Sequence, residues 1–571
     1  MDSPPAAPTS AASFSAGRRK AGTIIALIVA LAYGIFLGRH IGAWAGGSDS
    51  SGYLNNARLL RAGHLREARR AIAGLPADDL PSYSFIPLGF IPVGKTEMVP
   101  TYPIGLSLLM VAVSPFTGWA LAPHATMWLH LMAGAALMYA LARAWGFSVT
   151  SSFFGLLLLA LCPLYLFMGV QAMSDVPALV WCTAAVYFAW LSRKKNLWAL
   201  AAGTSVAIAV LVRPSDLLIV VPVALCLGLA WRRWLWLIAG GVPGAALQLY
   251  FNLALYHNAL TTGYGSIFEI FRLEYAPPAL RNYAQWLPVL LTPGIALLLV
   301  APWRSLRESR QLIAILASWV AVFLGFYVFY YHTHETWWYL RFILPAFPPL
   351  ILALLLAARG WLTRDTPAAQ ALAAAVVIVV IATWGYVFGS DQFFPNPDQR
   401  FPIWAGWSIA GALLLLGVVT RRTLPRREWI AGAIAAAVIF GGAAYWIKSL
   451  SAMDSGRGEK QYPDAAQWIR ANLPRDSVLL SMQMTGALLY YTDYTFLRYD
   501  QFDQKNFSPV DRFCREKKRP VYAVLFPFEL KEVMETRLPG RWTQVGTVRQ
   551  VTIWRRDAPA DAAAAPAANQ P

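Results

Sequence analysis

Apolar runs of about 20 residues, separated by short polar segments, recur along most of this chain. As an α-helix, one such run spans the roughly 30 Å of hydrocarbon in a bilayer. Inside a bilayer the backbone must satisfy its own hydrogen bonds, so repeated runs predict a bundle of membrane-spanning helices. The charge content agrees, because only 14% of the 571 residues are charged, whereas soluble domains carry about 25%.

Reading the runs with their flanking residues gives about thirteen predicted spans. They lie near residues 21–38, 125–142, 151–169, 174–191, 197–212, 215–230, 234–256, 285–301, 311–331, 340–358, 369–389, 402–419 and 428–447. One further run, 101–117, does not fit as a crossing, because it would move the basic residues 193–195 to the outer side. We therefore predict a re-entrant or surface-lying helix on the outer face, beginning at Pro103.

The net charge of +18 would suit a nucleic-acid-binding protein, but its distribution argues against one. Basic residues form short clusters between the apolar runs, which is the pattern of loops kept in the cytoplasm. With the N-terminus inside, all clusters fall on the cytoplasmic side; they are Arg18 to Lys20, Arg193 to Lys195, Arg232 and Arg233, Arg304 with Arg307 and Arg310, Arg421 and Arg422, and Arg426 and Arg427. The outer segments are then 39–100, 257–284, 332–339, 390–401 and everything after 447.

The two ends of the chain differ from its apolar middle. Residues 1–20 are predicted to be a disordered cytoplasmic tail, and residues 558–571 a second disordered tail. Residues 21–450 form the predicted membrane domain, with a large outer loop over 39–100. The first run resembles a signal peptide, because residues 43–45 mimic a cleavage site, but its length favours a retained helix.

After residue 450 the pattern becomes that of a soluble domain. Over 451–557 we expect an amphipathic helix at 464–470 and strands at 478–480, 521–525 and 551–554. Strands that alternate with short helices predict a small α/β domain. The predicted fold class is therefore mainly α: a polytopic helical membrane protein with an outer-face helix and a small C-terminal α/β domain outside the cytoplasm.

Several kinds of site are not indicated. The four cysteines show no CxxC or Cys/His spacing, so neither a disulfide framework nor a zinc finger is expected. The chain lacks a GxxxxGK[ST] loop, a dinucleotide fingerprint and a GxSxG elbow. No nucleotide cofactor is therefore expected, and an enzyme on the outer face would need an activated substrate that is lipid-linked.

Acidic residues of the outer loops gather at one end of the predicted bundle. Asp49, after the first span, is our candidate base; the alternative is a solvated loop acid or a helix cap. Asp175 begins the span at 174–191, where it would position an acceptor or a metal ion, or only cap its helix. Glu97 precedes the run at 101–117 and would have the same positioning role, or lie in solvent.

Two arginines, Arg213 and Arg341, stand at outer ends of spans, against the charge trend. There a guanidinium could hold a phosphate with paired hydrogen bonds, or reach lipid headgroups or a loop acid instead. The residues His332, His334 and Glu335 share one outer loop and could bind a divalent metal. One loop supplies few fixed ligands, so an interfacial belt of aromatic and polar residues is favoured.

Motifs in this order resemble those of the GT-C glycosyltransferases. They are Asp49 followed by Gly52-Tyr53, then Tyr102-Pro103 with Gly105, then Ser174 to Pro177, then Leu211 to Pro214, and last Arg341 to Leu350. The likeness runs over residues 21–450. It is closest to the bacterial branch related to protein O-mannosyltransferases and to the lipid A aminoarabinose transferase.

This resemblance implies an integral-membrane enzyme at the outer face of the bacterial cytoplasmic membrane. Such an enzyme moves a sugar from a polyprenyl-phosphate donor to a hydroxyl of a lipid, glycan or protein acceptor. In that family the acid of the first outer loop is catalytic and the aspartate of the second outer turn lies near the site; Asp49 and Asp175 occupy these places. A divalent metal could assist the departing phosphate.

The alternative function is a transporter or flippase of lipid-linked sugars. Such proteins often carry paired repeats and charges inside their spans. In this sequence the spans are almost free of charge and the acids lie beside a long loop, which favours chemistry at the membrane surface. A membrane scaffold would leave these acids without a role.

Overall fold

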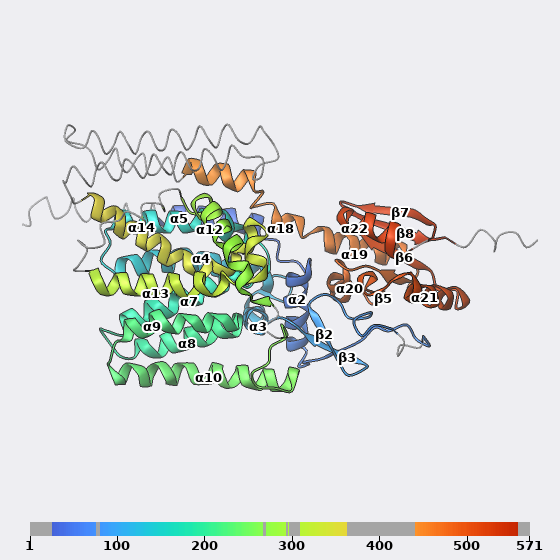
Figure 1. The fold of residues 1–571 in the computed structure, drawn as a ribbon, viewed down its shortest axis with the longest axis horizontal. Coiled ribbons are helices and arrows are strands. Elements are labelled where there is room, and N and C mark those ends of the chain that lie inside the picture. Colours follow the sequence, from blue (N-terminus) through green and yellow to red (C-terminus); the bar gives the residue numbers. More distant parts are fainter. Residues whose placement is uncertain are drawn as a thin grey trace, which may run out of the picture.

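The computed structural model describes residues 26–75, 80–265, 270–292, 309–362 and 440–557, without Pro539 but with Ile295 and Leu298. A long helix bundle stands beside a smaller domain that contains a sheet (Figure 1). The blue segment with α2 and β2 lies between the two. The predicted spans 369–389 and 402–419, most of 428–447, the end of 285–301, the loop 390–401 and both tails lie outside the described residues.

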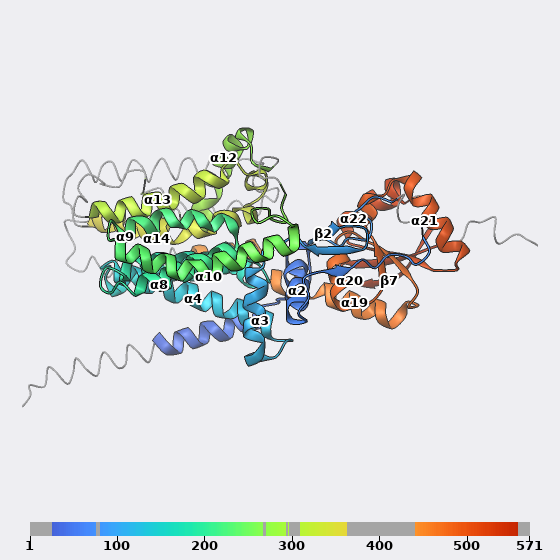
Figure 2. The ribbon, with the colours of Figure 1, turned by 90° about the horizontal axis from the view of Figure 1, so that it is seen from below.

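The bundle consists of apolar helices that mostly follow the long axis of the molecule (Figures 1 and 2). They are Ala26–His40, α4 (Ala122–Ala144), α5 (Val149–Ala160), α6 (Pro163–Gly169), α7 (Asp175–Leu191), α8 (Trp198–Val212), η1 (Pro214–Ile219), α9 (Val220–Leu227), α10 (Trp231–Tyr256), α12 (Ala276–Leu290), α13 (Arg310–Tyr327), η7 (Trp337–Ala346) and α14 (Phe347–Leu362), with the short turns η2 (Leu273–Tyr275) and η6 (Tyr331–His334).

Length and composition allow four described helices to cross a membrane: Ala122–Ala144, Trp231–Tyr256, Arg310–Tyr327 and Trp337–Ala358. A fifth crossing is possible if α5 and α6 count as one span. Others, such as α7 and α8, are apolar but have fewer than 18 residues. The sequence-based number of spans therefore stays a prediction.

The run expected as one span over 151–169 is bent by 56° between α5 and α6. Pro163 is the first residue of α6. A proline has no backbone N–H to donate and its ring collides with the preceding turn, so a straight helix cannot pass through this position.

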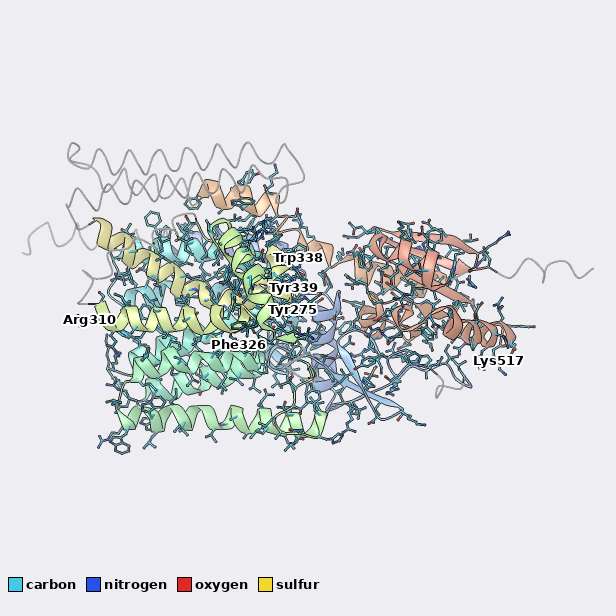
Figure 3. All side chains as sticks on the ribbon, viewed as in Figure 1. Tyr275, Arg310, Phe326, Trp338, Tyr339 and Lys517 are labelled. Carbon is cyan, nitrogen blue, oxygen red and sulfur yellow. The ribbon has the colours of Figure 1, made fainter. Side chains whose placement is uncertain are left out.

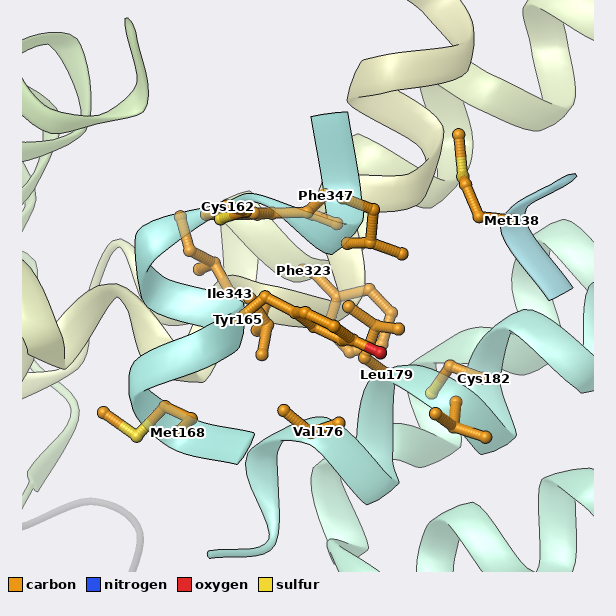
Figure 4. Packing of buried hydrophobic residues seen from close by; sticks show 14 of the residues in the cluster. Met138, Cys162, Tyr165, Met168, Val176, Leu179, Cys182, Phe323, Ile343 and Phe347 are labelled. Atoms are coloured by element: carbon orange, nitrogen blue, oxygen red, sulfur yellow. The ribbon is translucent and has the colours of Figure 1, made fainter. Parts of the chain in front are cut away.

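Side chains from four elements meet in the centre of the bundle (Figure 4). The ring of Tyr165 lies among Leu179, Phe323 and Ile343, and is itself fully buried. Its hydroxyl donates to the carbonyl of Leu131 at 2.6 Å. The polar end of this buried tyrosine is thus satisfied, as burial of a hydroxyl requires.

At the end of the bundle, α2 (Ser48–Arg61) and α3 (Gly105–Thr117) run across the direction of the long helices (Figure 2). Here the sequence predicted a surface-lying or re-entrant helix over 101–117. Three strands connect the two helices in an antiparallel sheet of order β1-β3-β2. They are β1 (Glu67–Ala68), β2 (Phe90–Val93) and β3 (Glu97–Pro100).

The C-terminal domain is a five-stranded mixed sheet of order β5-β4-β6-β8-β7 with helices. Strands β5, β4 and β6 are parallel, β8 pairs antiparallel with β6, and β7 pairs antiparallel with β8. The elements are α18 (Ser455–Gly458), α19 (Gln461–Asn472), β4 (Val478–Leu480), α20 (Thr485–Tyr491), β5 (Thr495–Leu497), η9 (Tyr499–Gln501), α21 (Gln504–Glu516), β6 (Val521–Leu525), α22 (Pro527–Glu532), η10 (Val533–Arg537), β7 (Trp542–Val548) and β8 (Val551–Arg556). The predicted α/β character of this region is confirmed.

Candidate active site

Asp49 lies in the first turn of α2, where two side chains hold its carboxylate. The Tyr102 hydroxyl donates to Oδ1 at 2.6 Å, and Arg341 Nη1 lies 2.7 Å from Oδ2. The side chain of Asp49 remains 22% exposed. The N-terminal end of a helix also favours a negative charge. Asp49 is therefore a fixed anion that is still accessible from outside.

A second ion pair lies in the same cluster. Arg213 Nη2 contacts Asp175 Oδ1 at 2.5 Å, and both residues are buried. The ring of Phe342 connects the two pairs, because the guanidinium carbons of Arg213 and Arg341 lie 5.2 and 5.0 Å from its centroid. An aromatic face attracts cations at this distance. The two predicted arginines thus lie against the same aromatic ring.

Local sequence explains how these side chains meet. Asp175 is the first residue of α7, and Arg213 ends α8 with an extended backbone. Pro214 follows Arg213, and a residue before proline is disfavoured in the helical conformation, so the chain turns away here. Arg341 comes from η7, which leads directly into the apolar α14. The residues converge where these elements end.

The neighbours of Asp49 set its charge state. Burial disfavours the carboxylate, but the Arg341 guanidinium and the Tyr102 hydroxyl outweigh burial and hold the pKa of Asp49 below its usual value. For Tyr102, burial and the adjacent Asp49 charge raise the pKa well above the usual value, so its hydroxyl keeps its proton. Asp49 is consequently ionised at neutral pH, with Tyr102 as a donor.

Both arginines have donors left over. Arg213 Nη1 and Arg341 Nε are buried and have no hydrogen-bond partner among the described residues. Unpaired buried donors are rare in folded proteins, since each forgoes the hydrogen bonds that water would offer. Two such groups, on neighbouring guanidiniums, are the donors that an anionic oxygen would satisfy.

Glu97 is not brought to this cluster. Its carboxylate pairs with Arg66 at 3.1 Å and is 47% exposed. Glu97 begins β3, in the sheet between α2 and α3, and its carboxylate is held by Arg66 rather than by a residue of the Asp49 group. The expected role in positioning an acceptor or a metal has no support in these contacts.

The expected metal ligands do not assemble either. His332 Nδ1 lies 3.0 Å from Glu335 Oε1, and the His332 ring stacks on Tyr339. His334 instead stacks on Tyr275, and both tyrosines lie at the end of the bundle nearest the C-terminal domain (Figure 3). In the described parts of the chain, no three His, Cys, Asp or Glu side chains could jointly hold a metal ion. The stacked rings form an aromatic cluster, and its place in an interfacial belt stays a prediction.

The structure places two further residues in the site, Tyr102 and Phe342, for which the sequence indicated no role. Tyr102 stood in the Tyr102-Pro103 motif and Phe342 beside Arg341, so both were visible as neighbours of candidates. Their roles depend on contacts between distant segments, which sequence spacing does not reveal.

Part of the chain matches a known family. Residues 123–260 match the family model described as dolichyl-phosphate-mannose-protein mannosyltransferase. This stretch carries Asp175 and Arg213, while Asp49 and Arg341 lie outside it. No curated protein sequence is similar to the chain at a significant level.

The chain is also similar to solved structures over nearly its whole length. The crystal structure of ArnT from Cupriavidus metallidurans in the apo state matches with a TM-score of 0.52 and 15% identity, covering 94% of this chain and 98% of ArnT. The structure of ArnT bound to undecaprenyl phosphate matches with a TM-score of 0.51 and 15% identity, covering 93% and 98%.

The chain thus has the fold of ArnT over nearly its whole length, and its residues 123–260 resemble the mannosyltransferase family model. Both likenesses agree with the GT-C resemblance that the motifs indicated. The resemblance inferred from the sequence is thereby confirmed.

Proposed function

We propose that this protein transfers a sugar from a polyprenyl-phosphate carrier to an acceptor hydroxyl at the outer face of the bacterial cytoplasmic membrane. The observation that carries the proposal is the cluster of Asp49, Arg341 and Arg213: an accessible carboxylate beside two guanidiniums with unpaired donors. A base and a phosphate site are what this transfer needs. The undecaprenyl phosphate bound by ArnT supports the choice of carrier.

In the proposed reaction Asp49 acts as the general base. Its carboxylate takes the proton of the acceptor hydroxyl as that oxygen forms a bond to the anomeric carbon. The bond from this carbon to the carrier phosphate breaks, and its electron pair leaves with the phosphate oxygen. A positioned base typically accelerates such a step by about 10²–10⁴-fold.

The two arginines stabilise the leaving phosphate in this proposal. Its negative charge grows as the bond breaks, and fixed cations placed at a developing charge lower the barrier. Arg341 has a second effect, because its charge lowers the pKa of Asp49. When the donor phosphate draws Arg341 toward itself, Asp49 loses its cation and becomes a stronger base.

Asp175 keeps Arg213 in place rather than contacting the acceptor directly. It is 1% exposed and its partner Arg213 is 8% exposed, so the pair is enclosed by protein. A divalent metal carried by the donor phosphate could add positive charge, and assays with and without EDTA measure that contribution.

The proposed orientation follows from the charge pattern. The N-terminus and the basic turn at 193–195 would lie in the cytoplasm, and the C-terminal domain outside it. Asp49 would then lie at the outer surface, where a lipid-linked sugar presents its headgroup.

The test is donor consumption by the purified protein. Wild type and Asp49→Asn are incubated with a panel of polyprenyl-phosphate sugars, and release of free lipid phosphate is followed. We expect wild type to consume one donor and the variant to be slower by about 10²-fold or more. Asp476→Asn, an exposed acid of the C-terminal domain, is the matched control. Full activity of Asp49→Asn would exclude Asp49 as the base.

A further inference from the structure

The C-terminal domain touches the helix that carries the candidate base. Its first helical turn, α18, packs backbone against backbone on the segment before α2: a Cβ on Gly42 would lie 1.8 Å from the carbonyl oxygen of Gly456. A Cβ on Gly456 would in turn lie 2.5 Å from the carbonyls of His40 and Val170. Only glycines allow this approach, so the segment before α2 is held closely to α18.

Glu459, directly after α18, reaches the first turn of α2. Its Oε2 accepts hydrogen bonds from the backbone N–H of Gly47 at 3.2 Å and from the Ser50 hydroxyl at 2.7 Å. Gly47 is the N-cap of α2 and has no side chain to cap the helix itself. The carboxylate therefore supplies, from another domain, the acceptor that a capping side chain normally provides. The capped turn contains Asp49.

The space for this carboxylate comes from Gly46. A Cβ at Gly46 would lie 1.7 Å from Glu459 Oε2, so any larger residue would displace the carboxylate. Among the described residues no Lys, Arg or His forms an ion pair with Glu459. Burial raises the pKa of Glu459 to about 7, with its two donors acting against this and the Asp49 charge adding to it.

A second group of contacts joins α2 and the segment before it to the C-terminal domain. Asn55 Nδ2 donates to the Gly486 carbonyl of α20 at 2.9 Å, and Tyr491 accepts from the Ala45 N–H at 2.9 Å. Arg58 Nη1 reaches the carbonyl of Leu489 at 3.2 Å. Glu459 supplies the hydrogen bonds of this interface to Gly47 and Ser50, on either side of Asp49.

We propose that Glu459 is a positioning residue for the transfer reaction. It holds the N-terminal turn of α2 through Gly47 and Ser50, and so fixes the Asp49 carboxylate between Tyr102 and Arg341. The inference rests on the proposed function and adds the C-terminal domain to the machinery of the site. Displacement of a catalytic group by about 1 Å can cost up to 10²-fold in rate, so such support matters.

The charge of Glu459 predicts a specific change of kcat with pH. Titratable groups that face it are Asp49 on α2, Tyr462 on α19 and Tyr491 on α20. Above about pH 7 Glu459 is ionised, binds its two donors more strongly and, being of like charge, makes Asp49 more basic. The kcat of wild type should therefore rise as the pH passes 7.

Three variants test the inference in the lipid-phosphate release assay. Glu459→Leu removes the acceptor, and Gly46→Ala pushes the carboxylate away without removing it. We expect each to lower kcat by about 10-fold with the donor KM changed by about twofold or less. The double variant should be no slower than the slower single variant, because both remove one interaction. Glu459→Gln keeps an acceptor, so it should regain the kcat of wild type at low pH and lack the rise near pH 7.

Glu535→Gln, an exposed acid of the same domain, is the matched control and should keep the wild-type profile. Gly46→Ala meets only the end of a flexible side chain, so it decides the question if Glu459→Leu does not fold. Wild-type kcat and pH profile in folded Glu459→Leu or in Gly46→Ala would overturn the positioning role while leaving Asp49 as the base. Absence of donor consumption by wild type would instead overturn the proposed function, and this inference with it.

Discussion

The contact between Asp49 and Arg341 presents a conflict at the level of single residues. A base works best with a pKa near the working pH, yet Arg341 and Tyr102 hold the pKa of Asp49 below its usual value. Arg341 pairs with Asp49 through Nη1 and has Nε unpaired. In the proposed reaction a donor phosphate that binds at Nε draws the guanidinium away from Asp49, which would make the base strongest when the donor is bound.

Replacement of Arg341 tests this exchange. Arg341→Gln removes the cation at the phosphate, so kcat/KM should fall by about 10²-fold or more. Without the cation the pKa of Asp49 rises, Asp49 is protonated at higher pH, and the acid limb of the rate profile moves upward. Arg341→Lys keeps the charge and should keep the acid limb in place. An unmoved limb in Arg341→Gln would show that Arg341 does not control the charge of Asp49.

Tyr102 is predicted to act through the same carboxylate. Tyr102→Phe removes the hydrogen bond to Asp49 Oδ1, which raises the pKa of Asp49 and loosens its orientation. We expect kcat to fall by about 10–100-fold, in line with the loss of one hydrogen bond to a charged group. Steady-state kinetics measure the loss, and Tyr250→Phe on the exposed side of α10 is the control. A faster Tyr102→Phe enzyme would mean that the hydrogen bond restrains the base.

The sequence identified four residues of this cluster and none of its pairings. Asp49, Asp175, Arg213 and Arg341 stood out because charges at the outer ends of apolar runs are unusual. Their partners could not be predicted, since which acid meets which arginine depends on how α2, α7, α8 and η7 pack. The same limit explains Glu97, which has the right residue type at the right end of the bundle but pairs with Arg66.

At the scale of elements, helices α8 and α10 pack with their backbones in close contact. A Cβ on Gly203 would lie 1.9 Å from the Leu237 carbonyl, and one on Gly240 would lie 2.1 Å from the Leu200 carbonyl. Inside a bilayer, hydrophobic burial does not drive helices together. Small residues instead let the helix backbones come close enough to pack tightly. A Cβ on Gly241, one position further along α10, would have its nearest neighbouring atom at 3.8 Å.

Alanine substitutions at these three glycines should therefore have different effects on the stability of the protein. Gly203→Ala and Gly240→Ala force two backbones apart and should destabilise the protein by about 1–3 kcal/mol. Gly241→Ala has room for its methyl group and should leave the stability unchanged or slightly raised, because alanine restricts the unfolded chain. Thermal unfolding in detergent measures the difference. Equal melting temperatures for all three variants would contradict the close α8–α10 contact.

Secondary structure was predictable where pattern and burial agreed. Strands β4 and β6 lie at the expected places because they are continuous apolar runs, and β8 because apolar residues alternate at its start. Strands β5 and β7 were not predicted: β5 has only two apolar residues, after Thr495, and β7 is an edge strand whose exposed face gives it a polar pattern. The bend between α5 and α6 was also missed, although Pro163 marked its place.

At the scale of the whole molecule, the segment around α2 is placed between two bodies. The bundle supplies Arg341, Arg213 and Asp175 on one side, and the C-terminal domain supplies Glu459 on the other. The order of motifs in the sequence indicated the residues that the bundle supplies. The contact that the C-terminal domain supplies joins residues about 410 positions apart, and no local pattern in α18 points to a contact with the site.

This arrangement requires the C-terminal domain and Asp49 to lie on the same side of the membrane, opposite the basic turn after α7. Cysteine labelling can test this directly, because all four native cysteines are buried. Glu535 and Lys194 are exposed in the two regions. With a membrane-impermeant maleimide on intact cells, Glu535→Cys should react, whereas Lys194→Cys should react only after permeabilisation. The reverse pattern would put Asp49 in the cytoplasm, beyond reach of a sugar carrier exposed at the outer surface, and would exclude the proposed reaction.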